Sequence, residues 1–235
     1  MQDEVTKHGR KIYKTVKDRR HSLAEKIKDI AIEIAIIVFA VSLSIWLHGW
    51  SEHRHEQKEV REFLGGLKSD LRGDITLLEK NRGVATRLDS SYHFLLALHD
   101  AQRAAITSDT AVYHNLYFDL IVTRCSIGRY EGFKSSGKMG LIENDSLKQH
   151  ILAFYQQSIP NLVYGEEFVN SIQSKILDLQ VNNEEKVPIK DFIKSAKLGA
   201  WFSMGSQNFK NNIGTYNDAI QQAKNIVAEI EKELE

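Results

Sequence analysis

An intramolecular disulfide is excluded in this chain, because Cys125 is the single cysteine among its 235 residues. A small fold held together by disulfides is therefore excluded as well. Helix-breaking residues are also scarce, since there are only two prolines and 14 glycines. This scarcity favours a mostly helical chain.

The chain also lacks net charge, because 31 basic side chains balance 31 acidic ones. The balance hides an asymmetry, since residues 1–29 carry nine Lys and Arg against five acids while the remainder is nearly neutral. A nearly neutral domain lacks the basic surface that nucleic-acid binding requires. We therefore expect no nucleic-acid partner, and the basic tail suits the anionic inner face of a membrane.

Motifs for catalysis are missing too. Residues 134–138, KSSGK, look like a phosphate-binding loop, but Met139 follows and the GxxxxGK[ST] spacing is absent. No G-x-S-x-G or HExxH motif occurs. His48, Glu52 and His55 share one helix face, as zinc ligands can, but further strong ligands are lacking nearby, so a solvated cluster is the simpler interpretation. We expect a protein that is not an enzyme, with no catalytic residue, no cofactor and no metal.

One long apolar run is present, and the rest of the chain is organised around it. Residues 30–50 read IAIEIAIIVFAVSLSIWLHGW, which is the length that a helix needs to cross a bilayer. Trp46 and Trp50 lie one turn apart near its end, where an aromatic belt meets the headgroups. This ending favours an uncleaved anchor over a signal peptide. A buried helix of a soluble protein is the alternative.

The basic residues that flank the run predict its orientation. Residues 1–29 contain nine Lys and Arg, whereas residues 51–65 contain three. The positive-inside rule then places the N-terminus in the cytoplasm. We expect a cytoplasmic tail (1–29), a transmembrane helix in the lipid bilayer (30–50) and an extracytoplasmic domain (51–235).

Glu33 is the one acidic residue inside the predicted span. Burying a carboxylate in a bilayer costs about 2–3 kcal/mol, so an acid at this position is a candidate functional residue. The simpler interpretation is that its side chain reaches the interface near Lys26 and Lys28. A proton- or ion-coupled membrane subunit that uses Glu33 is therefore one alternative function.

Two heptad-like apolar patterns predict packed helices outside the membrane. The first consists of Val60, Leu64, Leu67, Leu71, Leu78, Ala85, Leu88, Tyr92 and Leu95. Asp74 and Asn81 occupy two skipped positions of this pattern, where polar side chains can specify helix register. The second consists of Phe209, Ile213, Tyr216, Ile220, Ala223, Val227, Ile230 and Leu234. Since no stretch alternates like a strand, we expect an all-α fold, an antiparallel bundle that continues the transmembrane helix.

The region between the two patterns predicts shorter elements. Apolar spacing indicates a short amphipathic helix over residues 112–121. Glycines make residues 128–140 irregular, and Asn144 offers a cap for a long helix that Pro160 should kink. A short helix over 189–198 and a turn over 199–206 should precede the last helix.

Three groups of residues carry a family resemblance. In the first group, Glu33 opens an Ile/Val-rich span that ends in Trp50 and is followed by Glu52 and Arg54. The second group is FLGGLKSDLRGD at residues 63–74, and the third is YEGFKSSGKMGLIENDSLKQHILAFY at residues 130–155. This pattern resembles an uncharacterised family of single-pass membrane proteins from Bacteroidota, over roughly residues 28–155. Ser51 departs from the asparagine usual in that family. The resemblance implies a Gram-negative host, an inner-membrane anchor and a periplasmic domain, but it transfers no functional residue.

We therefore expect a non-enzymatic, membrane-anchored periplasmic protein that acts as a structural or interaction subunit of an envelope complex. Its partners would be further copies of the chain or other membrane-protein subunits. The predicted contacts come from the two helix patterns, through Leu64, Leu67, Leu71, Ile213, Ile220, Val227 and Ile230. A periplasmic ligand-sensing bundle is the other alternative.

Overall fold

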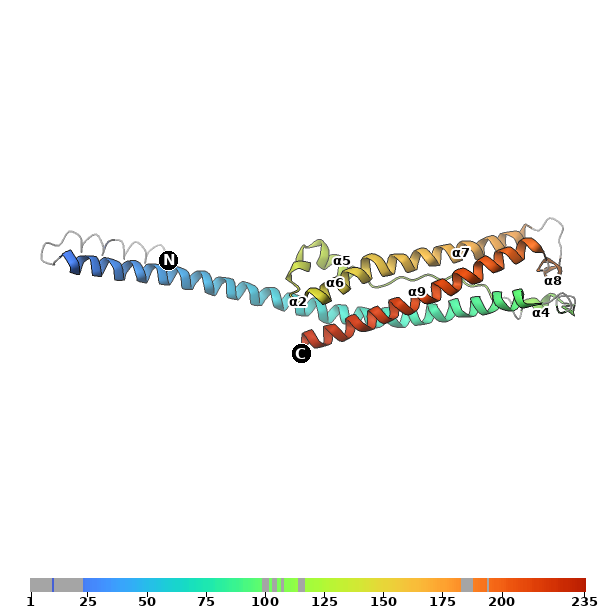
Figure 1. Cartoon of the computed structure of the whole chain (residues 1–235), viewed down its shortest axis with the longest axis horizontal. Helices are drawn as coiled ribbons and strands as arrows, with labels where there is room; N and C mark the ends of the chain where they lie inside the picture. The colour runs from blue at the N-terminus through green and yellow to red at the C-terminus, as the bar shows by residue number, and fades with distance from the viewer. Residues whose placement is uncertain are drawn as a thin grey trace. The chain divides into compact units, whose positions relative to one another are not determined.

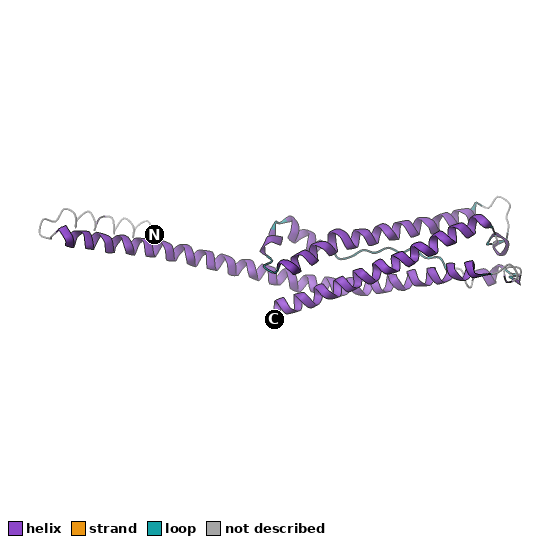
Figure 2. Cartoon of the chain, in the orientation of Figure 1, coloured by secondary structure: helices purple, strands orange, loops and turns teal. Residues whose placement is uncertain are grey.

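The computed structural model describes residues 10, 23–98, 102, 105–106, 108–113, 117–182, 188–193 and 195–235. All regular secondary structure in these residues is helical (Figure 2), which confirms the all-α prediction for this part of the chain. The chain divides into two compact units, Met1–Glu59 and Val60–Glu235. Each unit is described by itself below.

The N-terminal unit contains the first part of α2, an unbroken helix from Leu23 to Ala97. Most large apolar side chains between Ile27 and Trp50 are exposed. Among the described residues, α2 is the one helix that is long and apolar enough to cross a membrane. Length and composition alone also fit a signal sequence near the N-terminus.

The larger unit is built from long helical stretches joined by shorter elements (Figure 1). They are the part of α2 from Val60 to Ala97, the continuous run of α6 (Asp145–Ala153), η2 (Phe154–Ser158) and α7 (Ile159–Val181), and α9 (Ala196–Leu234). Shorter elements are α4 (Asp109–Tyr113), α5 (Gly128–Ser135), η1 (Lys138–Leu141) and α8 (Ile189–Phe192). The helix α9 packs along α7.

Side-chain pairs show that α9 runs antiparallel to α2. Arg72 on α2 donates to Glu231 on α9 at 2.6 Å, and Arg82 donates to Asn217 at 2.8 Å. As the residue number rises along α2, it falls along α9. The antiparallel packing expected from the sequence is therefore present between these helices.

The apolar pattern predicted on α2 lies inside the bundle. All nine of its apolar members are buried. On α9 the burial is broader, because the helix packs against two neighbours and buries positions on either side of the predicted row. Of the predicted contact residues, Leu64, Leu67, Leu71, Ile220 and Ile230 are buried, and Ile213 and Val227 are half-buried against the same core. These residues pack within this chain.

Five predicted elements differ from the structure. Residues 128–140, expected to be irregular, contain α5 and most of η1, and the helix expected over 189–198 ends at Phe192. The helix expected over 112–121 is wrong at its end, because α4 ends at Tyr113 and residues 117–121 are not helical. The turn expected over 199–206 is wrong, because α9 begins at Ala196, where the Ser195 side chain caps it by accepting the Leu198 N–H at 3.2 Å. The kink expected at Pro160 takes the form of a π-helical turn just before it, η2.

Candidate functional site

Residues 117–127 form a segment that belongs to no helix or strand of the described structure. A buried backbone needs partners for its N–H and C=O groups. Here side chains supply them, from α7 on one side and from α2 on the other. We call this segment, residues 117–127, the clamped segment.

The side chains of α7 bind Asp119, Ile121 and Thr123, which are every second residue in the middle of the clamped segment. Asn170 accepts the Ile121 N–H at 3.0 Å and donates to the Ile121 carbonyl at 2.7 Å. Gln173 makes the same pair of bonds with Asp119, at 3.2 and 2.7 Å. The spacing fits because two residues of extended chain span a distance close to one helical turn.

The side chains of α2 hold the other side of the clamped segment. Ser91 accepts the Tyr117 N–H at 2.8 Å, and Asp74 accepts the Ser126 N–H at 2.9 Å. Asn81 donates to the Val122 carbonyl at 3.2 Å. The two polar residues that interrupt the apolar pattern of α2 therefore position an extended segment.

The middle of the clamped segment exposes two large apolar side chains. Ile121 is buried, but Leu120 and Val122 on either side of it are 61% and 55% exposed. Leu177 and Val181, also exposed, continue the row of α7 that contains Asn170 and Gln173. We call Leu120 and Val122 the outer apolar surface.

A buried carboxylate lies at the centre of the bundle. Glu166 on α7 accepts the Thr123 N–H at 2.8 Å and also binds the hydroxyls of Thr123 and Tyr216. Burial and the neighbouring Glu166 carboxylate raise the pKa of Tyr216. On α9, Asn212 lies one turn from Tyr216 and is buried, and neither polar atom of its side chain has a hydrogen-bond partner among the described residues. The carboxylate is held by three donors and fixes the position of the clamped segment.

Two further polar groups lie near the end of the clamped segment. Burial raises the pKa of Asp74, and its hydrogen bonds with Ser126 oppose this only in part. Burial, with Asp74 and Glu166 close by, raises the pKa of the Cys125 thiol to about 12. A thiol in this state does not act as a nucleophile near neutral pH, because the thiolate is the reactive form.

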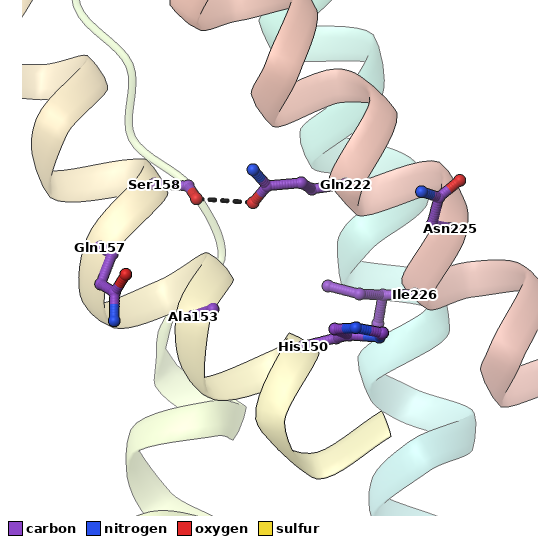
Figure 3. Close-up of a pocket in the computed structure, with 7 residues that line it drawn as sticks. All are labelled: His150, Ala153, Gln157, Ser158, Gln222, Asn225 and Ile226. Carbon is purple, nitrogen blue, oxygen red and sulfur yellow. Dashed lines mark hydrogen bonds between the residues drawn. The ribbon is translucent and has the colours of Figure 1, made fainter. Parts of the chain in front are cut away.

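A pocket of about 350 Å³ lies between the α6–η2 stretch and α9 (Figure 3). It is lined by His150, Ala153, Gln157, Ser158, Gln222, Asn225 and Ile226. Ser158 in the π-helical turn donates to Gln222 at 2.6 Å, and His150 Nδ1 lies 2.9 Å from both carboxylate oxygens of Glu229. Turns of this kind often occur at functional sites.

The residues predicted at the membrane lie on the first part of α2. Trp46 and Trp50 are exposed, and the Arg54 guanidinium lies 4.8 Å from the centre of the Trp50 ring. Glu33 is only 6% exposed, whereas its neighbours along the helix are exposed. It is the one buried side chain among residues 27–50, and it takes part in a polar or electrostatic interaction.

The weak metal candidates are exposed side chains. His48, Glu52 and His55 all lie on the surface of α2, and His55 Nε2 is 3.7 Å from Glu59. In the described ranges, no group of three or more His, Cys, Asp or Glu side chains is arranged to hold a metal ion.

The residues that look like a phosphate loop form a helix end. The hydroxyls of Ser135 and Ser136 donate to the carbonyls of Gly132 and Phe133 at the end of α5. Gly137 then adopts a positive φ of 75° and starts the turn into η1. The two hydroxyls are used to cap α5.

Sequence reasoning missed the polar row of α7. Glu166, Asn170 and Gln173 follow steps of four and three, which is the spacing of one helix face. That pattern could have indicated a polar stripe facing the core, but nothing in it names the extended segment as its partner. The pocket beside η2 had no signal in the sequence apart from Pro160.

Comparison with protein-family models, curated proteins and solved structures found no match for this chain. The resemblance to the Bacteroidota family therefore stays a prediction. The function has to be argued from the geometry of the clamped segment and the pocket.

Proposed function

We propose that the protein is a membrane-anchored helical bundle that binds another protein through the clamped segment. One observation carries this proposal: six side chains hold the segment in place, yet Leu120 and Val122 on it remain largely exposed. Binding residues often sit on irregular segments that a rigid scaffold positions.

The polar side chains that hold the segment are costly for a bundle core. A hydrogen bond contributes only about 0.5–1.5 kcal/mol net, because both groups give up water. Apolar side chains at Asn81 and Asn170 would fill a purely helical core without the risk of unpaired polar atoms. These polar side chains are explained if they hold the clamped segment in place so that its apolar side chains can contact a partner.

The outer apolar surface has the chemistry of a protein interface. Large exposed aliphatic side chains such as Leu120 and Val122 favour contact with another apolar surface. The predicted contact residues of α2 and α9 pack against each other's helices within this chain. We therefore assign contact with a partner protein to the clamped segment instead. The partner is a second copy of the chain or another membrane-protein subunit, because a shared membrane raises the effective concentration of both.

The basic tail supports the compartment that we propose. We place residues 30–50 of α2 as a single-pass anchor in the inner membrane of a Gram-negative bacterium, with the N-terminus in the cytoplasm and the bundle in the periplasm. The excess of basic residues in 1–29 over 51–65 supports the orientation. The resemblance to the Bacteroidota family supports the host.

Site-specific photo-crosslinking in membranes tests the docking role. A photoreactive amino acid replaces Leu120 or Val122 in the full-length chain, and Tyr164 serves as the control because it is exposed on the far side of α7. We expect one adduct of defined mass from positions 120 and 122 and none from position 164. Equal adducts at all three positions, or none at 120 and 122, would contradict the proposal.

A second function is favoured by the burial of Glu33. A carboxylate that is buried while its neighbours are exposed suits a proton- or ion-coupled subunit. Replacement of Glu33 by glutamine keeps the shape and removes the charge. Proton flux through membranes containing the purified complex should fall with Glu33→Gln, and an unchanged flux rules this function out.

A further inference from the structure

The pocket beside η2 is lined by carboxamide side chains from two sides. Gln157 comes from η2, and Gln222 and Asn225 come from α9. Figure 3 shows the Ser158 hydroxyl joined to Gln222 across the pocket, with Asn225 on the same helix as Gln222. None of the lining residues belongs to the outer apolar surface, so the pocket is a separate site.

The two carboxamides of α9 present donors to the pocket. Gln222 Oε1 accepts the Ser158 hydroxyl at 2.6 Å, and Asn225 Oδ1 accepts from Gln221 at 2.9 Å. Their oxygens are therefore engaged, and the NH₂ groups of Gln222 and Asn225 are the parts available to a ligand.

The α6–η2 side adds acceptors. His150 Nδ1 lies 2.9 Å from the Glu229 carboxylate, which places the proton of the neutral imidazole on Nδ1 and leaves Nε2 as an acceptor. The Gln157 side chain makes no hydrogen bond with another described residue, so its oxygen is a second acceptor and its NH₂ group a further donor. A ligand that matches this lining carries acceptors and donors together.

The described lining residues include no Lys, Arg, Asp or Glu. A carboxylate or phosphate would find no cation there, and the Glu229 carboxylate beside His150 would repel it. An ammonium group would leave the NH₂ groups of Gln222 and Asn225 without acceptors. The lining therefore suits an uncharged ligand.

The same chain already binds a non-helical backbone through a pair of carboxamides. On α7, Asn170 and Gln173 lie three positions apart and bind alternate residues of the clamped segment. On α9, Gln222 and Asn225 are likewise a Gln and an Asn three positions apart, and both line a pocket beside a neighbouring helix. The two pairs share residue types and spacing, which indicates the same kind of ligand.

We propose that the pocket binds a short extended segment of another protein through its backbone amides. The NH₂ groups of Gln222 and Asn225 donate to the carbonyls of two alternate residues of that segment. The residue between them points its N–H to the opposite side of the extended chain, where His150 Nε2 or the Gln157 oxygen accepts it.

The apolar part and the size of the pocket suit such a segment. Ala153 and Ile226 are the apolar residues of the lining, and they contact the side chains of the bound segment. A volume of about 350 Å³ is at the lower end of the range for small-molecule pockets, so the pocket holds a few residues of a peptide. A sugar also combines donors with acceptors, and it is the competing ligand in the test.

Saturation-transfer NMR of the full-length protein in lipid nanodiscs tests the proposal with capped trialanine, an uncharged peptide that offers mainly backbone groups. Empty nanodiscs give the blank. We expect a dissociation constant in the millimolar range, and binding at least about fivefold weaker when the central nitrogen of the peptide is methylated and no longer donates. The proposal is overturned by no binding of trialanine at about 20 mM, by equal binding of the two peptides, or by tighter binding of glucose than of trialanine.

A matched pair of variants on α9 locates the site. Asn225→Asp replaces the NH₂ donor with a second oxygen and keeps Oδ1 for Gln221, so it should weaken trialanine binding at least about fivefold. Asn211→Asp makes the same change in a similar setting outside the pocket, because Asn211 Oδ1 accepts from Gln207 at 3.3 Å. It should change the affinity less than about twofold. Equal affinities of the two variants place the peptide elsewhere and overturn the proposal, and thermal unfolding without peptide checks that both variants are folded.

Discussion

Asn170 binds both backbone groups of Ile121, accepting its N–H at 3.0 Å and donating to its carbonyl at 2.7 Å. A neighbouring strand would make the same two bonds in a sheet. One amide side chain on a helix thus replaces a strand partner. Gln173 repeats the arrangement at Asp119, and an extended segment is thereby held within an otherwise helical unit.

Removal of the Asn170 amide should destabilise the bundle. Asn170→Ala leaves the N–H and the carbonyl of Ile121 without partners in a partly buried setting, at a cost of about 1–3 kcal/mol in the free energy of unfolding. Urea unfolding of the full-length protein in detergent measures this. Gln207→Ala is the matched control, because its side chain bonds only within α9 at the surface, to Asn211. Equal effects of the two variants would contradict the role given to Asn170.

Two glycines of α9 should respond to alanine in opposite directions. A Cβ at Gly205 would lie 2.4 Å from the buried Tyr92 ring, which is itself packed against Phe202 and Phe209. Gly205→Ala should therefore destabilise the protein by about 1–3 kcal/mol. Gly214 has open space around it, so Gly214→Ala should stabilise the same helix by about 0.5–1 kcal/mol. Thermal unfolding of both variants measures the sign, and a stabilising Gly205→Ala would show that Tyr92 does not pack there.

Asp74 should make stability depend on pH. Burial raises its pKa above the usual 3.8, so the folded state binds the proton more tightly than the unfolded state. The contribution of Asp74 protonation to the free energy of unfolding is greatest below pH 3.8, and it falls as the pH rises towards the raised pKa of the folded state. Asp74→Asn removes the titrating group and keeps an oxygen acceptor for the Ser126 N–H.

The Asp74→Asn variant should therefore be more stable than the wild type at neutral pH, and the difference should shrink on acidification. Urea unfolding at several pH values from 3.5 to 7, roughly the range over which a raised carboxyl pKa acts, measures it. Parallel pH profiles for the two proteins would show that Asp74 is not desolvated in the folded state.

Cys125 should react slowly in the folded protein. Its pKa is raised to about 12 from an ordinary 9.0, so the thiolate fraction near pH 8 is about a thousandfold below that of a free thiol. Labelling with iodoacetamide, followed by intact mass, should be slow in buffer and complete in urea. Rapid labelling without urea would mean that residues around Cys125 open to solvent.

The core of α2 could be predicted from the sequence because its signal is local. The apolar residues from Val60 to Leu95 follow steps of three and four or their multiples. This pattern predicts one helix with one face buried against an apolar neighbour, and it requires no knowledge of distant residues. All of these apolar residues are buried in the bundle. The same signal could not say whether the neighbour belongs to this chain or to another.

The clamped segment could not be predicted because its partners are distant in sequence. Tyr113, Tyr117 and Ile121 follow helical steps of four, although the β-branched run from Ile121 to Thr123 favours an extended chain. The extended form is selected by Asn81 and Asp74 on one side and by the polar row of α7 on the other. Such tertiary contacts override local preference.

The turn expected over residues 199–206 failed for a related reason. Gly199 and Gly205 favour a turn by their own propensity. In the structure Ser195 caps the helix earlier, and the missing Cβ of Gly205 makes room for Tyr92 of α2. The glycine there serves close packing of two helices.

Native mass spectrometry of the full-length protein, purified gently from membranes, tests the docking role most directly. The wild type should be recovered in a complex of defined mass, and the double variant Leu120→Ser, Val122→Ser should be recovered as the single chain with an unchanged thermal midpoint. A Tyr164→Ser variant, altered on the far side of α7, should keep the complex. Recovery of the same complex from the double variant, or of a single chain from the wild type, would contradict the account.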